Sequence, residues 1–222
     1  MNPVVNSADS MNPIFRAFIE GGFVMYVILV IGALSVILII DRLVVLRSLR
    51  LDKKDFTDHV FKMILGGDMR QAISYCDTKS TPLSNTVKAG LVQVMNKRPD
   101  EEVQVAMDAS VLREMPRLEG FSSFLAVLGN IAVLAGLLGT IIGMIGSFRA
   151  VSSADPATKA QLLSEGISHA LNCTGFGLIV AITAILFYGL FQHMIQKSEN
   201  EMLETSMSLL NLVSSNRDKL RD

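Results

Sequence analysis

A run of twenty-eight residues without a charge, 121–148, constrains this chain more than any other feature. Small residues recur along it at spacings of three and four, which places them on one face of a helix. They are Gly129, Ala132, Gly136, Gly139, Gly143, Gly146 and, just beyond the run, Ala150. Each interior glycine costs a soluble helix roughly 1 kcal/mol relative to alanine, whereas in a bilayer a glycine face lets a second helix approach closely. A buried helix in a large soluble protein would explain the apolarity but not five glycines in register. The run therefore predicts a membrane-spanning helix.

Two further runs have the same character. Residues 23–40 contain no charge and form about 27 Å of helix, which is just long enough to cross the hydrocarbon core. Residues 166–195 also contain no Asp, Glu, Lys or Arg, and they include a second row of small residues: Gly166, Ala170, Thr174, Gly177, Ala181 and Ala184. Since half of all residues are hydrophobic, we predict an all-α integral membrane protein with three transmembrane helices, 23–40, 121–148 and 166–195.

The distribution of basic residues predicts the orientation of these spans. Five of them, Arg42, Arg47, Arg50, Lys53 and Lys54, follow the first span closely, whereas Arg16 stands alone before it. The positive-inside rule then puts the N-terminal segment 1–22 outside and the region 41–120 in the cytoplasm. Residues 149–165 become a short outer loop, and residues 196–222 a cytoplasmic C-terminal helix. Within 1–22 we expect a short amphipathic piece around Ile14–Ile19.

The region 41–120 predicts short helices rather than a catalytic domain. Helical periodicity is found in Phe56–Leu65, Asp68–Cys76 and Leu83–Met95, and again from Asp100 onward. The pattern after Asp100 reaches the second span without a clear stop, so we expect one long helix, bent at Pro116. In the tail, Leu203, Met207, Leu210 and Val213 keep a helical spacing, which predicts that the third helix also extends into the cytoplasm and packs beside the second.

Several classes of function are disfavoured. The chain has no glycine-rich phosphate loop, no nucleophile elbow and no His/Cys cluster, so we expect neither an enzyme, nor a metal site, nor a cofactor. Cys76 and Cys173 lie in very different segments, which makes a disulfide framework improbable. A net charge of −1 suggests no nucleic-acid partner.

Polar side chains are sparse within the spans. Thr140 and Thr174 each lie eight residues from the outer end of a span, so antiparallel helices would bring both hydroxyls to similar depth, roughly 12 Å below that end. They could line an ion path, or each could simply bond the carbonyl four residues back in its own helix. His169, within a turn of the outer end, is either an interfacial polar residue or a titrating group at the entrance to such a path.

Two motifs carry a family resemblance. AGLLGTIIGMIGSF (Ala135–Phe148) resembles the LGLLGTVxGMIxxF signature of the ExbB/TolQ/MotA proton-channel family, and GISHALNCTGFGLIVAI (Gly166–Ile182) resembles its GIxEALxxTAxGLxxAI. Asp41-Arg42 is similar to the acidic-Arg pair that closes the family's first span. Three spans favour the ExbB/TolQ branch over the four-span flagellar stators. The chain departs from the family at His169, which stands where the motif has Glu.

The resemblance implies a function in the bacterial inner membrane, with the outer segments in the periplasm. It implies a homopentamer whose second and third spans line a pore, with Thr140 and Thr174 as pore threonines. An ExbD/TolR-like single-span partner would supply the membrane aspartate that the spans lack. A TonB- or TolA-like protein could be the component that the complex drives. Packing would rest on Gly129, Gly136, Gly139, Gly143, Gly146, Gly177 and Ala181. The alternatives are a membrane scaffold without ion flux and a motility-dedicated stator of the same family.

Overall fold

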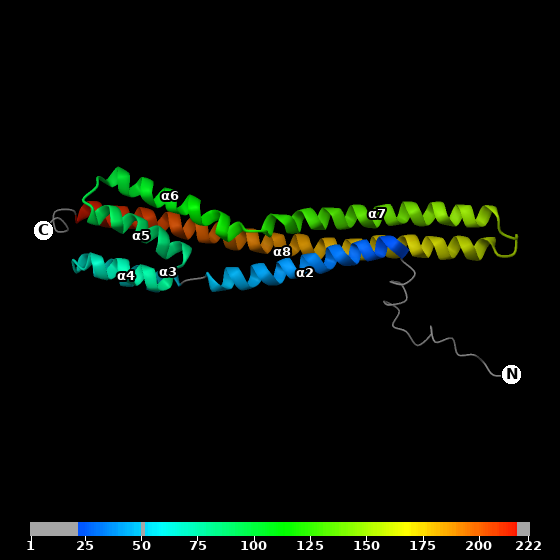
Figure 1. Ribbon diagram of the computed structural model, residues 1–222, viewed down its shortest axis with the longest axis horizontal. Helices are drawn as coiled ribbons and strands as arrows, with labels where there is room; N and C mark the ends of the chain where they lie inside the picture. Colours follow the sequence, from blue (N-terminus) through cyan, green and yellow to red (C-terminus); the bar gives the residue numbers. More distant parts are fainter. Residues whose placement is uncertain (1–21, 50–51, 217–222) are drawn as a thin grey trace, which may run out of the picture. The chain divides into compact units, whose positions relative to one another are not determined.

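The computed structural model describes residues 22–49 and 52–216, and every regular element within them is an α-helix (Figure 1). The helices are α2 (Gly22–Ser48), α3 (Lys53–Leu65), α4 (Met69–Lys79), α5 (Pro82–Met95), α6 (Asp100–Glu119), α7 (Ser122–Ser152) and α8 (Lys159–Ser215). Stretches that include α2, α7 and α8 are long and apolar enough to cross a membrane. The predicted all-α fold with three such helices is confirmed. The amphipathic piece expected around Ile14–Ile19 lies outside the described residues.

The described chain forms two compact units. Residues 22–40 and 122–189 make the first unit, and residues 41–121 and 190–216 make the second. The first unit contains the apolar spans, and the second contains the short helices together with the C-terminal part of α8. Each unit has its own packing, because the first is built from apolar and small residues and the second from amphipathic helices.

In the first unit, α7 and α8 run antiparallel and approach each other through glycine. A Cβ atom placed on Gly177 would lie 2.6 Å from the carbonyl oxygen of Ala132 and 3.1 Å from the Cα of Gly136. Real Cβ atoms do not approach other atoms this closely, so the two backbones touch where side chains would otherwise separate them. This is the close approach that small residues permit between membrane helices.

Helix α2 packs against this pair. A Cβ on Gly32 would lie 3.2 Å from Val180 of α8, and Ile31 shares a buried cluster with Ala132 and Ala181. The first unit is therefore a three-helix arrangement with small residues at its centre. Most large side chains of α7 point outward, Leu134, Ile141 and Phe148 among them, as lipid-facing side chains do.

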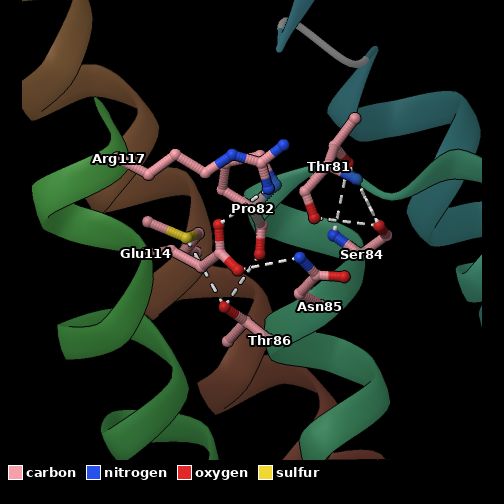
Figure 2. A network of polar contacts seen from close by, with 8 residues as sticks. Thr81, Pro82, Ser84, Asn85, Thr86, Glu114 and Arg117 are labelled. Carbon is pink, nitrogen blue, oxygen red and sulfur yellow. Dashed lines mark hydrogen bonds and ion pairs between the residues drawn. The ribbon is translucent and has the colours of Figure 1, made fainter. Parts of the chain in front are cut away.

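The second unit confirms the predicted short helices and shows side-chain caps at the start of two of them, α3 and α5. The Asp52 carboxylate accepts hydrogen bonds from the backbone N–H groups of Lys54 and Asp55 at the start of α3. Thr81 and Ser84 form a reciprocal capping box around Pro82, the first residue of α5 (Figure 2). These bonds satisfy backbone donors that a helix start otherwise leaves unpaired.

A buried carboxylate joins α5 to α6. Glu114 is only 8% exposed, and its Oε1 accepts a hydrogen bond of 2.8 Å from the Asn85 side-chain amide (Figure 2). Its other oxygen lies 3.5 Å from a guanidinium nitrogen of Arg117. Both carboxylate oxygens thus have partners, as a buried charge requires.

The C-terminal part of α8 packs on α5. Thr86 donates a hydrogen bond to the sulfur of Met202, and a Cβ on Gly90 would lie 2.6 Å from the sulfur of Met107 and 3.2 Å from Leu209. The third span and the tail form one uninterrupted helix from Lys159 to Ser215, so the expected continuity is confirmed. The helix begins earlier than predicted, and the loop before it is correspondingly shorter.

The expected single helix from Asp100 through the second span is wrong. Pro116 lies inside α6 without ending it, and the break comes at Gly120, whose φ is +44°. L side chains rarely adopt this conformation, which ends the α-helical hydrogen-bond pattern. The guanidinium of Arg42 occupies the space where a Cβ on Gly120 would stand. The backbone conformation favours glycine here, and any side chain would also displace the Arg42 guanidinium.

The glycine contact generates a matched prediction. Gly177→Ala places a methyl group against the Ala132 carbonyl, whereas Gly175→Ala meets no atom within 4 Å. Both changes gain the same helix propensity, so the difference between them reports the helix contact. We expect Gly177→Ala to be less stable than Gly175→Ala by about 1–3 kcal/mol, measured by thermal unfolding in one detergent. Equal midpoints would contradict the close approach.

Cys76 generates a second prediction. Its thiol is fully buried, and burial, together with the neighbouring Asp77 carboxylate, raises its pKa from 9.0 to about 12. A folded-state pKa above the unfolded value means that the stability contributed by the protonated thiol is complete below pH 9 and is lost as pH rises through 12. In a Cys173→Ala background, maleimide should label Cys76 at pH 8 only as fast as the protein unfolds. Rapid labelling of folded protein would contradict this burial.

Candidate ion pathway

The predicted packing glycines fall into two groups. Four of them contact α8 along α7: Gly129 lies against Ile185 and Ala181, Gly136 against Thr174 and Gly177, Gly139 against Cys173, and Gly143 against Ala170. Within residues 22–49 and 52–216, no atom lies within 4 Å of where a Cβ on Gly146 would be, and the neighbouring Ser147 is buried instead. The stripe is thus a contact within the chain from Gly129 to Gly143, and it leaves Gly146 uncovered.

The two threonines make different bonds. The Thr140 hydroxyl donates to the Leu137 carbonyl at 2.6 Å, a local bond within its own helix, although to the residue three back and not to the one four back that the sequence suggested. The Thr174 hydroxyl instead donates across the helix pair, to the carbonyl oxygen of Gly136 at 3.2 Å. Thr183, deeper in α8, also bonds its own helix, at Ile179. Thr174 therefore differs from both of the other threonines.

The Gly136 carbonyl is where Thr140 and Thr174 meet. In an α-helix this carbonyl accepts the backbone N–H of residue 140, so it receives the amide of Thr140 and the hydroxyl of Thr174 together. The two side chains lie within about one helical turn of each other in depth. Both are half-buried in the single chain. The Gly136 carbonyl and the two threonines thus form a small polar cluster, the Gly136 cluster, in a stretch of helix without charged residues.

His169 lies near the N-terminal end of α2. Its ring carbon Cε1 would lie 3.4 Å from a Cβ on Gly22, the first residue of that helix. The Nδ1 atom is buried and has no hydrogen-bond partner among the described residues. The imidazole thus has an unused polar atom. Such an atom is costly in an apolar setting.

A groove of about 780 Å³ adjoins His169. Ser147, Ser168 and Glu165 line it with polar side chains, and Gly143 and Gly166 also line it. Glu165 lies one helical turn before His169, and its carboxylate accepts a hydrogen bond of 2.9 Å from the Gln161 amide. A Cβ on Gly166 would collide with the Ser147 hydroxyl. The structure therefore groups His169, Glu165 and Ser147 in one groove, with Thr140 and Thr174 deeper along the same helices.

Sequence reasoning did not single out Glu165 or Ser147. Glu165 lies just outside the predicted third span, where a charge is unremarkable, although its spacing of four from His169 places both on one helix face. Ser147 directly follows Gly146 and lies four residues after Gly143, on the same helix face as that glycine. Only the pairing of α7 with α8 brings Ser147 against Gly166.

Comparison with known proteins adds independent information. The pattern of the MotA/TolQ/ExbB proton channel family matches residues 78–204. The chain is 28% identical to the biopolymer transport protein ExbB-like 3 of Synechocystis sp., over 78% of this chain and 81% of that protein. It is 30% identical to an ExbB homologue of Methanothermobacter thermautotrophicus, over 85% of this chain and 65% of that protein.

A third relative belongs to the Tol branch. The chain is 38% identical to the Tol-Pal system protein TolQ of Pseudomonas aeruginosa, over 41% of this chain and 39% of that protein. The relatives are thus named after ExbB and TolQ, which agrees with the branch suggested by the sequence motifs. With the family pattern covering more than half of its residues and three helices able to span a membrane, the chain is a multi-pass membrane protein of the MotA/TolQ/ExbB proton channel family, on the ExbB/TolQ side.

Proposed function

We propose that the chain is the pore-forming subunit of an inner-membrane complex that uses the proton-motive force to energise a Ton- or Tol-type process in the cell envelope. Family membership and the names of the ExbB and TolQ relatives support this role. In this proposal the chain forms a homopentamer, and its second and third spans surround a single-span partner of the ExbD/TolR type. The N-terminus faces the periplasm and the C-terminus the cytoplasm, as the distribution of basic residues predicts.

The proposal rests mainly on the Gly136 cluster. Thr174 donates to the Gly136 carbonyl oxygen across the helix pair, beside Thr140, in spans that contain no Asp, Glu, Lys or Arg. Hydroxyl groups can solvate a proton-carrying carboxylate but cannot store the proton themselves. A carboxylate therefore has to come from another chain, since intramembrane proton paths are normally built around ionisable groups.

His169 and Glu165 fit the outer end of this path. Both line the groove of about 780 Å³ near the outer ends of α7 and α8. In the family motif the position of His169 is a glutamate, so in this chain the carboxylate lies one turn earlier along the helix, at Glu165. We propose that Glu165 and His169 together take the place of that single acidic side chain.

Thr174 supplies the test. The chain is co-expressed with its single-span partner, and Thr174→Val is compared with Thr174→Ser, which keeps the hydroxyl. A hydrogen bond between membrane helices contributes about 0.6 kcal/mol on average, and the backbone bond to Gly136 remains, so both variants should assemble. We expect Thr174→Val to lose most of the proton-dependent function and Thr174→Ser to keep it, measured as envelope function and proton flux beside complex recovery.

Two outcomes would contradict the proposal. If the valine variant assembles and works normally, Thr174 is not part of the path. If the wild-type complex with its partner shows no proton flux at all, a membrane scaffold that retains only the packing glycines becomes the better description.

A further inference from the structure

A basic groove lies in the second unit, where α2 ends, α3 begins and α8 passes. Its volume is about 720 Å³, and it is open on one side. Residues far apart in the sequence line it, with apolar side chains beside charged ones: Leu46, Arg47, Asp52, Lys53, Lys54, Met194, Lys197, Ser198 and Glu201. We propose that this basic groove binds the phosphate of an anionic phospholipid headgroup.

The charges of the groove are not balanced by its own carboxylates. Four side chains are basic and two are acidic. The Asp52 carboxylate caps α3, Glu201 lies 4.0 Å from Lys197, and Lys53 pairs with Glu204. Arg47 and Lys54 remain, both exposed and without an ion-pair partner among the described residues. These two cations are free to bind an anion.

The groove also lies at the depth of lipid headgroups. Arg47 follows the last apolar residue of the first span, Ile40, by seven residues of helix, or about 10 Å, and its long side chain can reach back into the polar layer because helical side chains are directed toward the N-terminus. Lys197 is the first charged residue after the third apolar run and lies two residues beyond Ile195. The polar layer of a bilayer extends roughly 5–8 Å beyond the hydrocarbon on each side. Both helices therefore leave the apolar layer beside the groove.

The lining suits a lipid better than a free anion. Leu46 is buried and Met194 is half-buried beside the cations, so an apolar wall adjoins the phosphate-binding side chains. A phosphodiester headgroup with its glycerol and upper acyl chains matches this combination of surfaces. Basic pockets between membrane helices on the cytoplasmic side are a known type of site for anionic lipids. Inorganic phosphate would use the charges alone.

This inference does not depend on ion conduction, because the groove shares no residue with Thr140, Thr174 or His169. It predicts that anionic lipid stabilises the protein by binding in the basic groove. A neighbouring copy of the chain is the competing occupant, and it would need acidic side chains opposite Arg47 and Lys54. The experiment separates the two.

The test uses the full-length chain, purified and delipidated in a neutral detergent. Retained lipid is counted by native mass spectrometry after addition of dioleoyl phosphatidylglycerol, with dioleoyl phosphatidylcholine in a parallel sample. The variant Arg47→Gln/Lys54→Gln is compared with Lys62→Gln/Arg70→Gln, which removes two exposed basic residues outside the groove. Arg47 and Lys62 both lie in the last turn of a helix, so the pairs are similar in local helix effects and equal in lost charge.

We expect the wild type and the control pair to retain phosphatidylglycerol over phosphatidylcholine. The groove pair should bind phosphatidylglycerol on the order of tenfold more weakly or worse, since each basic residue near the surface adds a comparable attraction, while its oligomer remains intact. Equal retention in both pairs would overturn the proposal, as would equal retention of the two lipids. Stabilisation by inorganic phosphate without retention of phosphatidylglycerol would overturn the lipid assignment, and dissociation of the oligomer with unchanged lipid binding would identify a neighbouring copy as the occupant.

Discussion

The close approach of α7 and α8 at Gly136 and Gly177 is the contact on which the apolar unit depends. With no Cβ at either position, the backbones touch, and the Thr174 hydroxyl reaches a carbonyl on the other helix. In a bilayer the hydrophobic effect does not drive helices together, so packing of this kind has to supply the association. Helix α2 then adds Ile31 and Val24 to the surface that the pair presents.

The same contact gives the span its chemistry. The run 121–148 contains no charged residue, yet its Gly136 carbonyl receives both an amide of its own helix and a hydroxyl from α8. The glycine face and Thr174 are adjacent, so one helix contact provides both the close packing and the polar group at this level. In the function proposed above, this helix pair would present neutral polar groups to an acidic side chain from another chain.

The second unit follows the rules of water-soluble helices. Helices α3 and α5 begin with side-chain caps, and the buried carboxylate of Glu114 has partners on both oxygens. The break at Gly120 separates α6 from α7, and Arg42 packs directly on it. Arg42, in the acidic-Arg pair after the first span, therefore has a structural role beyond its charge. It packs against Gly120, where α6 ends.

The three apolar helices, the short helices of residues 41–120 and the channel family could all be predicted from the residues alone. Uncharged length, helical periodicity and motif spacing are local properties of the chain. Tertiary structure alone decided that Thr174 bonds across the pair while Thr140 bonds its own helix, that Gly146 is left uncovered, and that the break falls at Gly120 rather than Pro116. The tertiary structure alone also places Lys197 and Arg47 in the lining of one groove. Each of these features depends on which faces of two distant helices are in contact. Helical periodicity shows which residues share a face, but it does not show which other helix that face contacts.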